Sequence, residues 1–370
     1  MTRRFDVCIR GNGVVGRALA LLLARERLQV ALVGPPVASP AVPDVRAYAL
    51  NQNSKTLLES LRCWPAPEQA TDVTQMRILG DRGGELNFQA DPQHNPALTW
   101  IVDVPTLLTQ LDQALTYQPQ IELLETTPPA DLTVVCEGKA SSTRAEFGAD
   151  FDVTPYPQQA IATRLVCQHP HAQIARQWFS QSEILAFLPL GGPQGNSVAV
   201  VWSVQTERVQ QLLNSTPEDF CQSLEVASHH SLGPLKLISE RVAWPLQKAC
   251  ANRWSGKHEN QAWVLAADAA HNLHPLAGQG LNLGLADIAE LAKLIAQRDY
   301  WRSVSDEKLL RRYERSRKTD VAAMQTVTDG LQLLFSKEGG SWQSMRNWGM
   351  RGVEYSPAIK QWMVRQALGI

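Results

Sequence analysis

The chain has 370 residues, 44% of them hydrophobic, and its 35 Lys and Arg residues nearly balance its 36 Asp and Glu residues. This size and composition predict a globular protein of one large or two ordinary domains and exclude an intrinsically disordered chain. The charge balance provides no overall field that would attract nucleic acid, although Lys and Arg outnumber Asp and Glu from residue 298 onward.

The N-terminal segment has the pattern of a βαβ unit that binds a nucleotide. Apolar strands are expected over residues 5–9 and 30–33, with an amphipathic helix between them. The turn before that helix has the spacing G-x-G-x-x-G, formed by Gly11, Gly13 and Gly16. Because a strand precedes this spacing and a helix follows it, we expect a dinucleotide site here rather than the apolar region of a signal peptide.

One part of such a unit is missing at the end of its second strand. An acidic residue normally stands there and binds the ribose, whereas this chain has Gly34 followed by two prolines. Asp44 is the nearest acidic residue that follows, and it is a distant substitute.

The six cysteines indicate a reducing compartment. None of them is spaced as a C-x-x-C pair, so they are expected to be small core residues rather than disulfides or metal ligands. No apolar run reaches the roughly 20 residues that a transmembrane helix needs. We therefore expect a cytoplasmic protein that is at most peripheral at the inner face of a membrane.

A second glycine-rich segment, "LAADAAHNLHPLAGQGLNLGLAD", lies between an apolar strand and an apolar helix. Asp268 follows the strand, and a carboxylate at that place can accept hydrogen bonds from sugar or polyol hydroxyls. The helix is expected to begin near Leu281, so the amides of Gly280, Leu281 and Asn282 carry partial positive charge. Such amides stabilise a ring that becomes negative on reduction, as a flavin does.

This segment resembles the second FAD fingerprint of the single-component aromatic hydroxylases, G-D-A-A-H-x-x-x-P-x-x-G-Q-G-x-N-x-G-x-x-D. It differs from that fingerprint only at Ala267, which replaces the first glycine. The resemblance implies that Asp268 binds the ribityl chain of FAD. It also implies that the isoalloxazine ring is lined by Pro275, Gly278, Gln279, Gly280 and Asn282. Pro275, Gln279 and the neighbouring His271 are the candidate catalytic residues.

Other interpretations of this segment are open. Asp268, His271 and His274 could be imagined as metal ligands, but the flanking proline and glycines disfavour the continuous helix that their spacing requires, and no metal is predicted. The histidines could also act as a general base, or as hydrogen-bonding braces beside the turn.

Further segments narrow the resemblance to the FAD-dependent hydroxylases of ubiquinone biosynthesis, which are class A flavin monooxygenases. In "DVRAYALNQNSKTLLESLRCW", the resemblance places Arg46 near the flavin, and an ordinary surface arginine is the alternative. In "WIVDVPTLLTQLDQAL", it suggests that Gln110 faces the cofactor.

The middle motif of this family, V-x-A-D-G-x-x-S-x-x-R, is altered in "LTVVCEGKASSTR". Glu137 and Gly138 stand in place of the Asp-Gly pair that serves both cofactors, and Ser141 or Ser142 precedes Arg144. Together with Gly34 and Ala267, the longer Glu137 side chain predicts a flavin that is bound weakly or exchanges.

The expected fold is mixed α/β, with a Rossmann-like FAD-binding domain of the aromatic hydroxylase type. We expect this domain to comprise residues 1–65, 100–150 and 250–297. An antiparallel substrate sheet is expected from residues 66–99 and 151–249, including a hairpin in "AFLPLGGPQGNSVAVVWSV". A helical extension over residues 298–370 completes the chain.

The resemblance implies a monooxygenase that uses FAD, NADPH or NADH, and O2 to hydroxylate an aromatic, prenylated phenol of ubiquinone biosynthesis. A second G-x-G-x-x-G is absent from the sequence, which agrees with a pyridine nucleotide that docks transiently. Two alternatives remain: a catalytically weakened or inactive subunit of a biosynthetic complex, and a hydroxylase of a soluble aromatic compound.

The C-terminal tail mixes aromatic and basic residues. This mixture suits a helix at a membrane interface, but aromatics at helical spacing also form cores, homo-oligomer contacts or contacts with other biosynthetic enzymes. The residues concerned are Trp342, Trp348, Met350, Trp362 and Met363.

Overall fold

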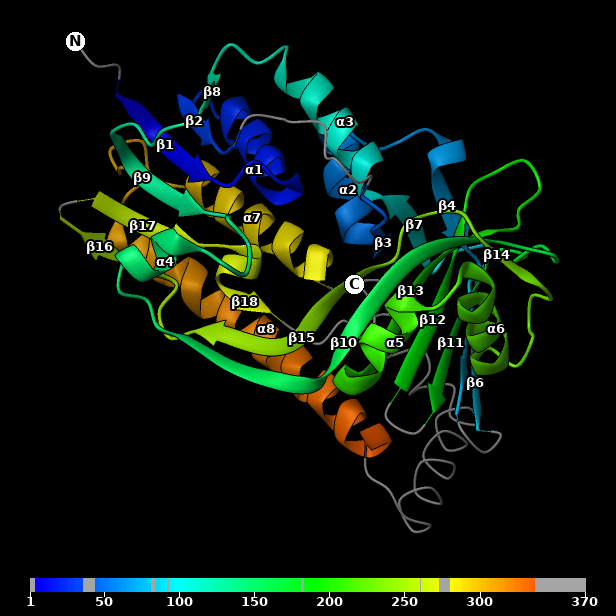
Figure 1. Cartoon of the computed structure of the whole chain (residues 1–370). Helices are drawn as coiled ribbons and strands as arrows, with labels where there is room; N and C mark the ends of the chain where they lie inside the picture. The colour runs from blue at the N-terminus through cyan, green and yellow to red at the C-terminus, as the bar shows by residue number, and fades with distance from the viewer. Residues whose placement is uncertain are drawn as a thin grey trace.

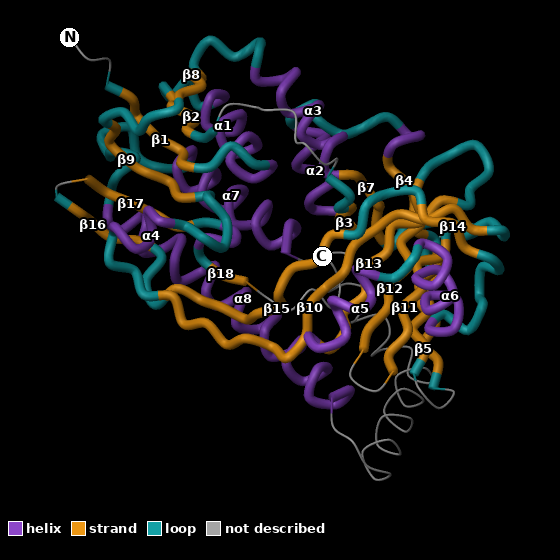
Figure 2. Tube along the Cα trace, in the orientation of Figure 1, coloured by secondary structure: helices purple, strands orange, loops and turns teal. Residues whose placement is uncertain are grey.

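The computed structural model describes residues 4–35, 44–80, 84–91, 93–180, 183–259, 261–272 and 280–336, with side chains described as far as residue 326. Three sheets and eight α-helices make up this described part (Figures 1 and 2). The architecture is mixed α/β, as predicted.

A six-stranded sheet carries the N-terminal βαβ unit. Its strand order is β16-β17-β9-β1-β2-β8, and all neighbours are parallel except the β16–β17 hairpin. Its central strands are nearly continuous apolar runs, as expected of parallel strands that are buried on both faces. The strands are β1 (Phe5–Arg10), β2 (Val30–Val33), β8 (Ile121–Leu124), β9 (Ala130–Val135), β16 (Ser255–His258) and β17 (Gln261–Leu265).

Helices α1 (Val14–Arg25) and α7 (Gly280–Ala296) pack against this sheet and against each other in the largest hydrophobic cluster. The long helix α8 (Glu307–Ser336), orange in Figure 1, packs against α7 and β16. Two short elements follow strands of this sheet: α4 (Ser142–Glu146) and the 3-10 turn η2 (Ala267–Ala269).

A small antiparallel sheet has the order β3-β7-β4, formed by Ala47–Leu50, Thr99–Asp103 and Ala70–Val73. Helices α2 (Gln52–Ser60) and α3 (Val104–Leu115) follow β3 and β7, and the 3-10 turn η1 (Pro67–Gln69) precedes β4. The first turn of α2 is capped by Asn51, whose side chain accepts a hydrogen bond from the Ser54 N–H.

A nine-stranded sheet has the order β18-β15-β10-β13-β12-β11-β5-β6, with β14 paired to β10. All pairs are antiparallel except β5–β11, and β12 and β13 form the predicted hairpin. Helices α5 (Thr206–Asn214) and α6 (Pro217–Ala227) contribute to the core on one face. The strands are β5 (Gln75–Leu79), β6 (Glu85–Gln89), β10 (Phe151–Cys167), β11 (Ile174–Ser180), β12 (Glu183–Leu190), β13 (Ser197–Gln205), β14 (Leu235–Leu237), β15 (Val242–Ala251) and β18 (His271–Asn272).

Strands β10 and β15 join the two large sheets. They run side by side from the region of the six-stranded sheet into the nine-stranded sheet, with a register shift between Pro155 and Gln159 (Figure 1). Strand pairing also crosses two of the predicted domain boundaries, since β4 pairs with β7 and β18 pairs with β15. The exact division of the chain into domains stays a prediction.

No helix in the described part of the chain combines the length and the apolar character that crossing a bilayer requires. The tail residues from Trp342 to Met363 lie outside the described residues.

Candidate functional site

The glycine turn after β1 contains two glycines that the fold itself requires and one that leaves space. A Cβ on Gly11, whose φ is +118°, would overlap the carbonyl oxygen of Cys136, and a Cβ on Gly16 would overlap the carbonyl oxygen of Gly11. A Cβ on Gly13 would meet no atom of the described residues within 4 Å. Gly13 is the N-cap of α1, whose first amides have no acceptor within the helix, so an anion can approach these amides there.

At the end of β2, the side chain of Asn12 occupies the position where an acidic side chain would start. A Cβ on Gly34 would lie 2.8 Å from Asn12 Nδ2, and this Nδ2 donates a hydrogen bond of 2.8 Å to the carbonyl oxygen of Pro35. The Asn12 side chain of the glycine turn therefore fills the space that an acidic side chain at position 34 would need.

Asp268 follows β17 within η2 and has no hydrogen bond or ion pair with any residue that the structure describes. Its burial raises the pKa of the carboxyl group above the ordinary value, and the nearby charges of Lys139, His271 and Arg46 only partly oppose this shift. A desolvated carboxylate without such partners is a strong acceptor for hydroxyl groups of a ligand.

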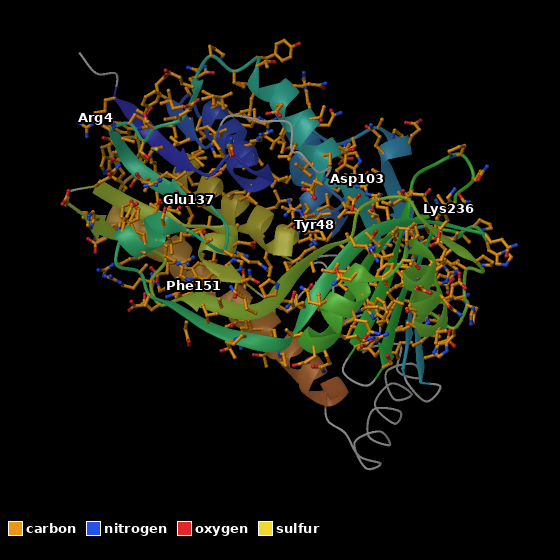
Figure 3. All side chains as sticks on the ribbon, viewed as in Figure 1. Arg4, Tyr48, Asp103, Glu137, Phe151 and Lys236 are labelled. Atoms are coloured by element: carbon orange, nitrogen blue, oxygen red, sulfur yellow. The ribbon has the colours of Figure 1, made fainter. Side chains whose placement is uncertain are left out.

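Charged and phenolic side chains from two other elements surround Asp268. Arg46, before β3, lies 2.6 Å from Asp44 through Nη2 and Oδ2, and this hydrogen bond raises the pKa of the guanidinium. Burial raises the pKa of Tyr48 and lowers the pKa of Lys139, and Asp268 influences both groups. Figure 3 places Tyr48 beside the first turn of α7, toward the middle of the molecule.

Tyr48 and Lys139 were not predicted as site residues from the sequence. Tyr48 lies two positions after the predicted Arg46, and Lys139 occupies a variable position of the middle motif. Their proximity to Asp268 depends on how β3, β9 and β17 come together, and no local pattern signals it.

Glu137, labelled in Figure 3, lies two residues after the end of β9 and is bound by other residues of the chain. It lies 2.9 Å from Arg10 Nε, and it accepts hydrogen bonds from Ser141 Oγ at 2.8 Å and from Thr143 Oγ1 at 2.5 Å. These hydrogen bonds and the Arg10 charge outweigh the effect of burial and lower the pKa of Glu137. Ser141, rather than Ser142, is the serine that caps α4.

The rest of the middle motif supports the Asp268 segment. Arg144 donates a hydrogen bond of 3.1 Å from Nη1 to the carbonyl oxygen of Ala269, and its guanidinium lies 3.6 Å from the ring centre of Phe151. Gly138 has a φ of +87°, and a Cβ there would meet no atom within 4 Å in the part of the chain that the structure describes. Space next to Gly138 is therefore available to a ligand.

The first turn of α7 is tied to the β3–α2 connection through Asn282. Its Oδ1 accepts hydrogen bonds from the Asn51 N–H at 3.0 Å and from Ser54 Oγ at 2.7 Å, and its Nδ2 donates to the carbonyl oxygen of Ala49 at 2.8 Å. The buried Asn282 side chain thus fixes the start of the helix. Leu281 is also buried.

The two glycine-rich segments meet at α7. A Cβ on Gly284 would lie 3.1 Å from Val15 Cγ2, in the first turn of α1, and 2.8 Å from the Cβ of Ala267. A Cβ on Gly280, where α7 begins, would meet none of the described atoms within 4 Å. The sequence-predicted segments around Gly11 and Asp268 are therefore brought together with open space at three glycines.

His271 is buried and bound within the protein. Its Nε2 lies 2.7 Å from Oδ2 of Asp287, and the ring of Trp254 stacks on it at 5.1 Å between centroids. This geometry favours the bracing role over that of a base, and its catalytic role stays a prediction. Asp287 and its partner Arg317 were not identified from the sequence, although Asp287 is the last residue of the quoted FAD fingerprint.

The structure does not describe four of the predicted site residues, and it places a fifth only on a neighbouring helix. His274, Pro275, Gly278 and Gln279 lie outside the described residues. Gln110 is half-buried on α3, the helix that packs against α1. In the described part of the chain, His, Cys, Asp and Glu side chains form no group of three or more that could hold a metal ion.

Residues 118–328, more than half of the chain, match the family model described as the FAD binding domain. The chain belongs to this family. FAD is therefore its cofactor, and the open space at the glycines and the desolvated Asp268 carboxylate fit such a ligand.

Relatives extend the match to the whole chain. The ubiquinone hydroxylase UbiL of Rhodospirillum rubrum is 28% identical over 98% of this chain and 89% of its own length. The 3-demethoxyubiquinol 3-hydroxylase of Escherichia coli is 28% identical over 99% of this chain and 98% of its own length. The predicted resemblance to FAD-dependent hydroxylases is thereby confirmed.

The fold is also similar to that of a solved monooxygenase structure. The p-nitrophenol 4-monooxygenase PnpA of Pseudomonas putida superimposes with a TM-score of 0.76 at 15% identity, covering 99% of this chain and 98% of the other. At this identity the likeness concerns the fold alone.

Proposed function

We propose that this chain uses FAD, NADPH or NADH, and O2 to hydroxylate the aromatic ring of a prenylated phenol in ubiquinone biosynthesis. The observation that carries the proposal is the partly buried Asp268 carboxylate, which has no hydrogen-bonding partner among the described residues and lies beside the meeting point of the two glycine-rich segments. The names of the two relatives support a ubiquinone precursor as the substrate.

The cofactor would be held at three places. The first amides of α1, next to Gly13, would bind the phosphates, and Asp268 would accept hydrogen bonds from the ribityl hydroxyls. The amides of Gly280 and Leu281 would lie toward the ring, together with Pro275, Gly278 and Gln279 as the family resemblance implies. When bound, FAD supplies electron transfer and the activation of oxygen.

Two described side chains would orient the phenol, one as a hydrogen-bond donor and the other as a fixed positive charge. Because burial raises the pKa of Tyr48, its Oη keeps a proton at neutral pH and can donate a hydrogen bond. Arg46 stays protonated beside Asp44 and contributes a fixed positive charge near Asp268. These two side chains are the described groups we expect to contact the ring or the substrate.

A prenylated substrate would lie in a membrane, so the protein would have to reach it there. We propose that the aromatic and basic tail from Trp342 to Met363 makes peripheral contact with the inner face of the membrane, where such a substrate resides. Binding of the full chain to vesicles of anionic lipid, compared with a variant ending at residue 336, tests this role.

The central experiment is a turnover assay with the purified, FAD-loaded protein. A short-chain prenylated phenol should stimulate NAD(P)H oxidation, and mass spectrometry should detect a product heavier by one oxygen atom. The Asp268→Ala variant should lose FAD and turnover together. Phenol-independent NAD(P)H oxidation without a hydroxylated product contradicts the proposal.

The occupied Glu137 side chain favours a second candidate, a subunit with the fold of the enzyme but little turnover. Arg10, Ser141 and Thr143 already bind this carboxylate, so it offers less to a cofactor than an acid without such partners does. A deletion strain separates the candidates. Full restoration of ubiquinone synthesis by the Asp268→Ala form supports the structural role, whereas failure to restore it supports the enzyme.

A further inference from the structure

Ala267 adopts a backbone conformation that normally favours glycine. Its φ is +55°, and it lies two residues after Leu265, the last residue of β17, and directly before Asp268. A residue with a Cβ enters this left-handed region only at an energetic cost, so other contacts must hold Ala267 in place.

Asp287 on α7 provides that contact. Its Oδ2 accepts a hydrogen bond of 2.8 Å from the Ala267 N–H and lies 2.7 Å from His271 Nε2. Its Oδ1 accepts a hydrogen bond of 2.7 Å from Arg317 Nε. Asp287 is completely buried, so its charge depends on these three partners.

Arg317 brings α8 into the same contact. It is buried, and its Nη1 lies 2.6 Å from Asp320 Oδ2 on the same helix. One turn earlier, Tyr313 Oη donates a hydrogen bond of 3.0 Å to the carbonyl oxygen of Leu265. Helix α8 therefore contacts both the end of β17 and the carboxylate that holds the following turn.

We propose that Arg317, Asp287 and His271 form a positioning cluster that keeps Ala267 left-handed and thereby aims the Asp268 carboxylate at the hydroxyl groups of FAD. The cluster makes FAD affinity depend on α8, a helix that lies far in the sequence from the N-terminal glycine turn. This inference rests on the proposed role of Asp268 in FAD binding. None of the three cluster residues needs to touch the cofactor.

Glycine at position 267 offers a specific test, because glycine takes a positive φ without the cost that Ala267 incurs. We would measure the FAD dissociation constant of apoprotein by quenching of flavin fluorescence, and the melting temperature of the same samples. The variants are Arg317→Met, Ala267→Gly and the double variant. Arg315→Met is the matched control, since Arg315 is exposed on the same helix.

We expect Arg317→Met to weaken FAD binding about tenfold or more, and Ala267→Gly in the same chain to recover most of that loss. Arg315→Met should bind FAD like the parent. If Arg317→Met does not fold, Arg317→Lys retains one charged donor for Asp287, and its smaller affinity loss should likewise be recovered by Ala267→Gly.

Two results overturn the inference: unchanged affinity in Arg317→Met, or a loss that follows the melting temperature and is not recovered by Ala267→Gly. The second result is expected of a cluster that only stabilises the fold. A protein that binds FAD with the expected pattern but does not hydroxylate a phenol overturns the proposed function and leaves the positioning cluster standing.

Discussion

The same added methyl group should affect stability most at one glycine of the turn and FAD binding most at another. In Gly16→Ala the new Cβ overlaps the carbonyl oxygen of Gly11, and backbone cannot move aside cheaply. We expect a loss of about 1–3 kcal/mol in the free energy of unfolding of the apoprotein. In Gly13→Ala the methyl enters open space at φ −75°, which alanine tolerates, so only the N-cap preference is lost, about 0.5–1 kcal/mol.

Gly13→Ala should instead show its main effect on the affinity for FAD. A methyl group at the N-terminus of α1 keeps a phosphate from the amides, and losing one charge-assisted hydrogen bond costs about 1.5–3 kcal/mol, or about 10- to 100-fold in the dissociation constant. Urea unfolding of the apoprotein and titration with FAD measure the two effects separately. Parent-like FAD affinity in Gly13→Ala, or parent-like stability in Gly16→Ala, would refute this account of the turn.

Three further substitutions test the buried polar groups. The pKa of Asp287 is lowered, so its stabilisation of the fold is present above the ordinary carboxyl pKa and is lost as the pH falls through the lowered value. Asp287→Asn should therefore lower the free energy of unfolding by about 3–5 kcal/mol near pH 7. In urea unfolding, the variant should also depend less on pH than the parent does below about pH 4. The pKa of Asp268 is raised, so this carboxylate is protonated at a higher pH than an ordinary carboxyl group. As the pH is lowered, the FAD affinity of the parent should therefore begin to fall while the pH is still above about 4. In the same titration, Asp268→Asn should bind FAD weakly at every pH. Asn282→Ala removes three hydrogen bonds and should lower the free energy of unfolding by about 3 kcal/mol, as measured in urea, with unchanged stability as the contradicting result.

Local patterns predicted the elements that build the site. The strand bounds 5–9 and 30–33 agree with β1 and β2 to within one residue, because the apolar runs and the glycine turn are set by neighbouring residues. The helix expected near Leu281 begins at Gly280 for the same reason. Only the family resemblance predicted that the two segments bind the same FAD molecule, because neither segment alone indicates this.

Contacts between distant segments could not be predicted from the sequence. Arg317 is an ordinary residue of an amphipathic helix until the packing of α8 on α7 brings it to Asp287, 30 positions earlier. The side chain of Asn12 fills the place next to Gly34 only because β1 and β2 are adjacent. Such pairings are decided by tertiary packing, and no spacing rule anticipates them.

The three departures from the family pattern are each matched by a contact within the chain. Asn12 packs at Gly34, Asp287 binds the N–H of Ala267, and Arg10 pairs with Glu137. These contacts stabilise the altered positions without using the space next to the glycines.

The environment of Asp268 indicates whether a chain with these three departures still binds FAD. A chain that binds no cofactor would gain stability by pairing this partly buried carboxylate, since a polar group that loses water without gaining a partner costs free energy. Among the described residues, the structure instead leaves Asp268 without a hydrogen-bonding partner and leaves open space at Gly13, Gly138 and Gly280. A ligand that donates hydroxyl groups to Asp268 would offset this cost, and this argument favours the proposed FAD site over a subunit that has lost its cofactor.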